Sequence, residues 1–318
     1  MLTAMAQGNH RQGKGMAMHF IMFTKHLEGK DIGGLIAALQ SVGVEGADLC
    51  VRPNYPVTPE NAATELPKAA RAFAKAGLNI PLVTTPTRYT DPKERTVEPL
   101  FAACAEAGVR FVKLGYWMMG EAGYWATVDK VRKDLEGFED IARRTGAAVV
   151  VHTHSGETMG LNACSVMNLV KGFDPKCVGV FLDSGHLTIT GEPISIALSA
   201  VGEYLKVFAF KDVVRERVVR QKVEVQTEPV LIRDVHGGKA GAVVTRTRVV
   251  DEGKPAWQMK VVPLGEGYVD WPGLLSRLGA LEFDGPVSIH SEYSGVPVDT
   301  VVDLTRIDVR YIRALLGS

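Results

Sequence analysis

Residues 178–186 read Val-Gly-Val-Phe-Leu-Asp-Ser-Gly-His, an apolar run typical of a buried β-strand that ends in a carboxylate. The same change from apolar to polar residues occurs at 147–154 (AAVVVHTH), 207–212 (VFAFKD) and 286–292 (PVSIHSE). In a parallel β/α barrel the carboxyl ends of the strands converge on one mouth, where side chains distant in sequence become neighbours. These strand ends therefore predict a barrel whose mouth carries a metal-assisted enzyme site.

Strand and helix patterns alternate along the chain around this stretch. The predicted strands are His19–Phe23, Gly46–Val51, Ile80–Thr85, Arg110–Leu114, Ala147–Val151, Val178–Leu182, Lys206–Phe210 and Val287–Ile289. Helix patterns lie between them, and the clearest are Asp31–Ser41, Pro59–Ala76, Asp91–Ala107 and Thr127–Thr145. Such alternation favours a parallel sheet, and eight repeats favour its closure into a single (β/α)8 TIM barrel.

One segment, residues 213–262, interrupts the alternation because it contains no helix pattern. It carries three further strand patterns and a glycine pair typical of a turn, at Val218–Val225, Val230–Val235, Ala242–Val250 and Gly237-Gly238. We expect a β-hairpin-like insertion at the barrel mouth, after strand 7. Three roles stay open: a lid, an interface arm of a homo-oligomer, or a purely structural flap.

The composition is that of a soluble globular protein, with 46% hydrophobic and 23% charged residues. Lys+Arg and Asp+Glu both number 36, which argues against a nucleic-acid or anionic-membrane partner. No apolar run reaches the roughly 18–20 residues that span a bilayer. The cysteines form no C-x-x-C pair and suggest free thiols in a reducing compartment, so we expect a cytoplasmic protein. Residues 1–15 resemble a disordered leader, and residues 16–318 form the barrel domain.

The strand ends carry residues that can bind a divalent metal ion. Alternation along a strand places His152 and His154 on one face, while Asp183 and Glu292 are carboxylates at the ends of two other strands. Divalent ions such as Mn, Mg or Zn accept carboxylate and imidazole ligands together. Asp183 and Glu292 are therefore the first metal candidates, followed by His152 and then by His154 and His186. For each histidine alone, a hydrogen-bonded structural role is the alternative.

Several motifs together resemble the xylose-isomerase-like barrel superfamily, which includes sugar-phosphate isomerases and epimerases, inosose dehydratase and the bacterial apurinic endonuclease. Residues 180–186, with Gly191-Glu192 after them, resemble its D-x-G-H segment, and residues 264–271 (LGEGYVDW) resemble its L-G-x-G-x-V-D-W turn. Residues 23–27 (FTKHL) and 48–53 (DLCVRP) are similar to a subgroup of predicted sugar isomerases. The resemblance extends over roughly residues 18–316 and also implies a TIM barrel.

The resemblance implies a metal site with Glu, Asp, His and Glu from strands five to eight. Asp183 and Glu292 match this pattern, whereas His152 stands in place of the first Glu. The family pattern H-x-K-D reads Ala209-Phe210-Lys211-Asp212, so the histidine of strand seven is missing. The chain is therefore expected to hold its ion (Mn, Zn, Mg or Co) through Asp183, Glu292 and His152.

A metal at this place predicts proton abstraction beside a carbonyl group, through an enediolate. The resemblance to epimerases implies that Glu292 is base as well as ligand and that His186 holds a substrate hydroxyl. Lys113 and Lys211 end strands and are candidates to stabilise an anionic oxygen. For each such cation the alternative is a solvated surface charge.

Other residues near the mouth are candidates for substrate binding. Lys25, His26 and Arg52 end strands one and two, and His154 lies beside His152. Trp117 belongs to a Gly-rich loop after strand four, where an aromatic ring can stack on a sugar, although ordinary loop packing is the alternative.

The predicted function is a sugar or sugar-derivative isomerase or epimerase that acts on a small-molecule sugar or polyol. A metal-dependent dehydratase of a keto-polyol, which is a lyase, and a non-catalytic carbohydrate-binding barrel are the alternatives. No G-x-x-x-x-G-K-[ST], G-x-G-x-x-G or G-x-S-x-G motif occurs, which argues against nucleotide cofactors and acyl-enzyme chemistry. The balanced charge makes an apurinic endonuclease the weakest alternative.

Overall fold

The computed structural model describes residues 18–219, 222–233, 239–251 and 255–317. Its described residues divide into two compact units, one formed by residues 18–213 with 261–317 and the other by those between 214 and 260. The expected leader, residues 1–15, lies outside the described residues. In the described part of the chain, no helix is both long and apolar enough to cross a membrane.

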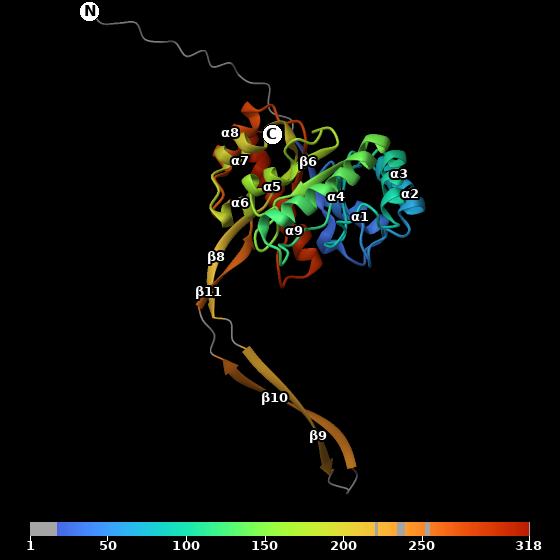
Figure 1. Ribbon diagram of the computed structural model, residues 1–318. Coiled ribbons are helices and arrows are strands. Elements are labelled where there is room, and N and C mark those ends of the chain that lie inside the picture. The colour runs from blue at the N-terminus through green and yellow to red at the C-terminus, as the bar shows by residue number, and fades with distance from the viewer. Residues whose placement is uncertain (1–17, 220–221, 234–238, 252–254, 318) are drawn as a thin grey trace, which may run out of the picture. The chain divides into compact units, whose positions relative to one another are not determined.

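The first unit is a closed barrel of parallel strands in the order β1-β12-β7-β6-β5-β4-β3-β2 (Figure 1). Its strands are β1 (His19–Phe23), β2 (Gly46–Cys50), β3 (Asn79–Thr84), β4 (Phe111–Lys113), β5 (Ala148–His152), β6 (Val178–Asp183), β7 (Leu205–Phe210) and β12 (Pro286–Ile289). The predicted TIM barrel is confirmed.

Helices surround this barrel (Figure 1). They are α1 (Ile32–Val42), α2 (Ala62–Lys75), α3 (Val97–Ala107), α4 (Tyr124–Thr145), α5 (Ala163–Val170), α6 (Ser184–Thr190), α7 (Ile194–Val201), α8 (Trp271–Ala280) and α9 (Val298–Leu316), with the 3-10 turns η1 (Thr24–Leu27) and η2 (Gly202–Tyr204). Helix α1 begins after Asp31, whose carboxylate accepts a hydrogen bond from the Gly34 amide at 2.7 Å. It ends at Gly43, which has φ +83°.

Two helices begin later than the sequence predicts. Helix α2 starts at Ala62 and not at Pro59, because the Asn61 side chain accepts a hydrogen bond from the Thr58 amide at 2.7 Å and closes a turn there. Helix α3 starts at Val97 and not at Asp91, whose side chain accepts from the Lys93 amide at 2.9 Å. In both cases a polar side chain satisfies the backbone of a turn that precedes the helix.

The barrel interior is filled by buried apolar side chains that alternate along the strands, namely Ile21, Leu82, Phe111, Ala148, Val150, Phe181, Val207 and Ala209. A larger apolar cluster lies around them and includes residues of the surrounding helices. Because successive side chains of a strand point to opposite faces, the residue two positions beyond an interior residue also points inward. The polar side chains at the strand ends therefore point into the barrel mouth.

The insertion after β7 is confirmed as β-rich, but its strands differ from the prediction. It contains β8 (Asp212–Val219), β9 (Lys222–Arg233), β10 (Lys239–Asp251) and β11 (Pro255–Val262). Strand β9 pairs antiparallel with β10, and β8 pairs with β11. The predicted turn at Gly237-Gly238 lies outside the described residues. The role of the insertion stays a prediction.

The buried carboxylate of Asp212 organises the turn that precedes α8. Its two oxygens accept five hydrogen bonds, at 2.8 to 3.2 Å, from the backbone amides of Val213, Gly265, Gly267 and Val269 and from the indole nitrogen of Trp271. Gly265 has φ +94°, and a Cβ at Gly267 would overlap the carboxylate, so both positions require glycine. The LGEGYVDW segment is thus a cradle for Asp212.

Candidate active site at the barrel mouth

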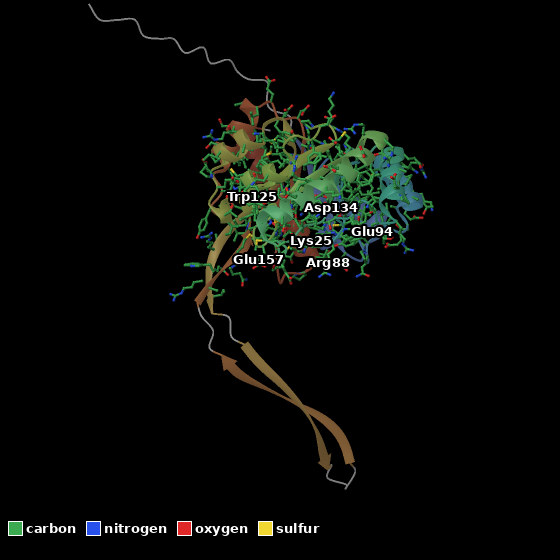
Figure 2. All side chains as sticks on the ribbon, in the orientation of Figure 1. Lys25, Arg88, Glu94, Trp125, Asp134 and Glu157 are labelled. Atoms are coloured by element: carbon green, nitrogen blue, oxygen red, sulfur yellow. The ribbon has the colours of Figure 1, made fainter. Side chains whose placement is uncertain are left out.

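A cavity of about 340 Å³ opens among the carboxyl ends of the barrel strands. Of the residues predicted for the site, it is lined by Lys25, Arg52, Lys113, His152, His154, Lys211 and Glu292. Figure 2 shows Lys25 together with Glu157, another residue of the lining. The cavity thus lies at the carboxyl ends of the strands, where active sites of this fold are found.

Alternation along each strand explains which polar side chains enter this mouth. On β5 the interior residues Ala148 and Val150 are followed two residues later by His152. On β6, Phe181 is followed in the same way by Asp183. Beyond β12, His290 follows at the same interval after Ser288. Each of these three side chains thus takes the inward-facing position at the end of its strand or directly after it.

His152, Asp183 and His290 form a compact group of possible metal ligands. All three are buried, and one ligand atom from each lies within 4.8 Å of the others. Asp183 Oδ2 is 3.4 Å from His152 Nε2 and 3.5 Å from His290 Nδ1. The two imidazole nitrogens make no hydrogen bond of good geometry within the described structure, and Oδ2 of Asp183 has only an ion pair with Lys211. Buried polar atoms are normally paired, so this convergence indicates a site for a ligand.

The surroundings of His152 favour its neutral form. Burial holds the pKa of His152 well below its usual range, although the neighbouring Asp183 acts in the opposite direction. Its Nδ1 lies 2.9 Å from the hydroxyl of Tyr116. An Nδ1 proton donated to that hydroxyl leaves the Nε2 lone pair directed at the cluster.

His290 lies between two buried carboxylates. Its Nδ1 faces Asp183, and its Nε2 lies 3.5 Å from Oδ2 of Asp48. Asp48 is itself fixed by hydrogen bonds from Thr84 at 2.5 Å and Ser288 at 3.0 Å. Burial opposes the charge of His290, but the adjacent carboxylates of Asp183 and Asp48 outweigh burial and raise its pKa. Asp48 therefore orients the ring of His290.

Lys211 places a buried positive charge beside the cluster. Its ammonium lies 3.2 Å from Asp183 Oδ2, 2.5 Å from Glu292 Oε2 and 3.2 Å from His186 Nε2. Burial acts to lower the pKa of Lys211, but Asp183 and Glu292 raise it above its usual value. Burial likewise acts to raise the pKa of Asp183, but Lys211 and His186 hold it well below its usual range. Lysine and carboxylate are therefore both charged.

Glu292 lies at the edge of this group and faces the cavity. Its carboxylate also forms an ion pair with Lys25, and its side chain is 17% exposed. Burial would raise its pKa, but the ammonium of Lys211, with His290 and Lys25, holds it well below the usual range. Glu292 Oε2 is 3.9 Å from His290 Nδ1 and is not part of the three-residue ligand group.

Two cations line the opposite part of the cavity, at the ends of β2 and β4. Burial lowers the pKa of Lys113 to about 7, and nearby Arg52 acts in the same direction. The Lys113 ammonium lies 3.8 Å from the centre of the Tyr116 ring. Arg52 donates from Nε to the Thr85 carbonyl at 3.1 Å.

Some predicted residues lie outside the lining of the cavity. Trp117 is buried and donates to Asp134 at 2.9 Å, which matches the loop-packing alternative and not sugar stacking. His186 is buried, and its two nitrogens face Lys211 and Ser155. His26 is half-buried, and burial lowers its pKa.

The sequence prediction named neither His290 nor Asp48 as a site residue. His290 ends the same apolar run that led to Glu292, and its place two residues after Ser288 was the available signal. Asp48 lies within β2, where a carboxylate between apolar residues gave no indication of facing inward.

Comparison with protein-family models matches residues 36–315 to the xylose isomerase-like TIM barrel. The chain belongs to this family. A comparison with curated proteins finds no significant match.

Several solved structures resemble the chain in fold. The apo 3-keto-D-glucoside 4-epimerase YcjR from E. coli is 15% identical, with a TM-score of 0.64 over 94% of this chain and 100% of that one. The IOLI protein, solved with a zinc atom, is 15% identical, with a TM-score of 0.65 over 93% and 98%. The probable 3-DHS dehydratase AsbF from Bacillus anthracis is 13% identical, with a TM-score of 0.63 over 93% and 98%.

The residues at the mouth fit a divalent metal ion. Two imidazoles and one carboxylate converge with buried ligand atoms, and the imidazole nitrogens make no hydrogen bond of good geometry among the described residues. First-row divalent ions accept this donor set. Ala209, in register with Asp183, supplies no ligand from β7. The site therefore offers three ligands from the β5, β6 and β12 ends.

Proposed function

We propose that the chain is an isomerase or epimerase of a sugar or sugar derivative, which moves a proton on a carbon beside a carbonyl group. The observation that carries the proposal is the position of Glu292, an ionised carboxylate that lines the cavity next to the His152–Asp183–His290 ligand group. An ionised carboxylate beside a Lewis-acid site is the arrangement that proton abstraction requires. The structural likeness to sugar epimerases supports this proposal.

We assign the metal to His152, Asp183 and His290, and a metal bound there would polarise a carbonyl oxygen of the substrate. A set with two imidazoles favours Zn over Mg. Glu292 accepts the proton, and the sequence also predicts it as a metal ligand. Lys211 adds a fixed positive charge for the developing enediolate oxygen, and His186 positions the Lys211 ammonium.

The experiment is solvent exchange. The full chain, loaded with Zn or Mn, is incubated in D2O with a panel of ketoses, keto-polyols and keto-sugar acids. Deuterium uptake at the carbon beside the carbonyl is followed by NMR. We expect uptake with at least one member and its loss in Glu292→Gln. Glu157→Gln, which changes an exposed glutamate of the same lining, is the matched control and retains exchange.

Binding of zinc to the same variants separates the two roles of Glu292. If Glu292 is a base only, Glu292→Gln retains the zinc affinity, whereas Asp183→Asn loses it. Loss of zinc in both variants would assign Glu292 as a ligand. Exchange in Glu292→Gln at the wild-type rate would refute its role as the base.

A dehydratase of a keto-polyol is the second candidate, because dehydration starts with the same proton abstraction and AsbF has a similar fold. Loss of one water from the product mass identifies this reaction, since isomerisation leaves the mass unchanged. A chain that binds no metal and exchanges no proton in any member of the panel would instead be a non-catalytic carbohydrate-binding barrel.

A further inference from the structure

The cations that line the cavity differ in how they are paired. Lys211 and Lys25 both form ion pairs with Glu292, and Lys211 forms another with Asp183. Arg52 and Lys113 line the same cavity, yet no carboxylate among the described residues lies within 4.0 Å of either cationic group. The unpaired positive charge is therefore concentrated on the β2–β4 side of the mouth.

Lys113 is the more informative of these two cations, because it is only 3% exposed. Its ammonium contacts the face of Tyr116, which is a weaker partner than an anion. The buried carboxylate of Asp48, on β2, is already in contact with Thr84, Ser288 and His290. A buried ammonium without a counter-ion is unfavourable, and an anion entering the cavity would relieve that cost.

Arg52 is held in a geometry that leaves its outer edge available to a ligand. Its Nε donates to the Thr85 carbonyl, and the guanidinium lies 5.8 Å from the centre of the Phe23 ring. Thr85 also donates to the Lys113 carbonyl, from its amide at 3.1 Å and from its hydroxyl at 2.8 Å. Thr85 thus connects the two cations through the ends of three adjacent strands. A guanidinium held at Nε can present its terminal nitrogens to a planar anion.

We propose that Arg52 and Lys113 form a subsite for an anionic substituent, a carboxylate or a phosphate ester, on the sugar that the cavity accepts. The proposal rests on the proposed function in one respect only, namely that the ligand of this cavity is a sugar. The cavity volume of about 340 Å³ is at the lower end for ligand pockets, roughly 300–1,000 Å³, and suits a single sugar unit. A surface role cannot explain Lys113, because its side chain is buried.

The test compares three C6 probes that differ only in the group at C1: D-glucitol, D-gluconate and D-glucitol 1-phosphate. Binding to the metal-loaded full chain is measured by titration calorimetry. We expect at least one anionic probe to bind tenfold or more tightly than D-glucitol. Arg52→Gln and Lys113→Met each abolish this preference. Arg88→Gln removes an exposed arginine that does not line the cavity (Figure 2), and it retains the preference.

The comparison of variants also controls for chelation of gluconate by the metal, because neither substitution touches the ligand group. Arg52→Lys keeps the charge and loses the planar guanidinium, so it is expected to retain part of the preference for the anion. It replaces Lys113→Met as the second variant if Lys113→Met does not fold. The preferred anion distinguishes a sugar acid from a sugar phosphate. Anionic probes that bind no more tightly than D-glucitol, or a preference that survives both substitutions, would overturn the subsite.

Failure of the subsite and failure of the proposed function give different results. A preference for the anion without proton exchange on any panel member removes the isomerase and leaves the subsite. Proton exchange on neutral ketoses without a preference for the anion removes the subsite and leaves the isomerase.

Discussion

The Asp212 cradle provides a prediction whose size can be worked out from its hydrogen bonds. Five donors depend on this one carboxylate; the Val213 and Trp271 bonds are buried and the other three are partly buried, and no other acceptor serves them in that turn. A buried hydrogen bond to a charged acceptor contributes about 1.5–3 kcal/mol, so an average of about 1 kcal/mol per donor allows for the three partly exposed bonds. Asp212→Ala should therefore lower the free energy of unfolding by about 5 kcal/mol, which is comparable to the whole stability of many domains.

Asp212→Asn gives a graded result, because three of the donors face Oδ2 and two face Oδ1. An asparagine can direct its oxygen to the three and its amide to the two, so we expect a loss of about 2–3 kcal/mol. Asp270→Ala is the control, since Asp270 accepts one backbone hydrogen bond at the start of α8 and should cost about 1 kcal/mol.

Urea unfolding followed by the helical circular dichroism signal measures these losses. Every described helix belongs to the barrel unit, so this signal reports the barrel and not the insertion. An Asp212→Ala loss no larger than that of Asp270→Ala, with an unchanged urea dependence, would refute the reasoning.

Three further predictions concern buried residues at the mouth. Lys113 has a pKa of about 7 when folded and 10.5 when unfolded, so between these two pH values the folded chain binds fewer protons and its stability should rise with pH. Lys113→Met removes the cost of burying the charge, so it should raise the melting temperature more at pH 6 than at pH 9. An equal rise at both pH values would contradict this. Asp48→Asn should weaken zinc binding about 10–100-fold through His290, as measured by calorimetry, whereas unchanged affinity would show that Asp48 does not orient the ring. A Cβ at Gly185 would lie 2.8 Å from Lys211 Cγ, so Gly185→Ala should cost about 1–3 kcal/mol in urea unfolding, and a neutral result would mean that the lysine stem moves freely.

The sequence predicted the barrel well because its signals are local. An apolar run that ends in a polar residue marks a strand end without knowledge of its neighbours, and β6 illustrates this. The start of α2 was predicted less well, because Pro59 satisfies the rule for a first helical turn while Asn61 closes a different turn.

Which residues form the site could not be predicted fully, because it depends on contacts between residues that are distant in sequence. The pairing of His290 with Asp48 is set by barrel closure, which brings β12 and β2 to the two sides of β1. The ion pairs of Lys211 depend on Gly185, whose missing side chain leaves room for the lysine stem. Neither relation can be obtained from spacing along the chain.

The order of strands in the barrel has a consequence for the length of substrate that the cavity would accept. Strands β4 and β12 are four places apart in a ring of eight, so Lys113 and Glu292 approach the cavity from opposite walls. With an anionic end anchored at Lys113 and the proton removed at Glu292, the width of the barrel would act as a ruler that counts carbon atoms between charge and reacting centre. A sugar acid one carbon shorter or longer would then be rejected by its length, with no contact dedicated to excluding it.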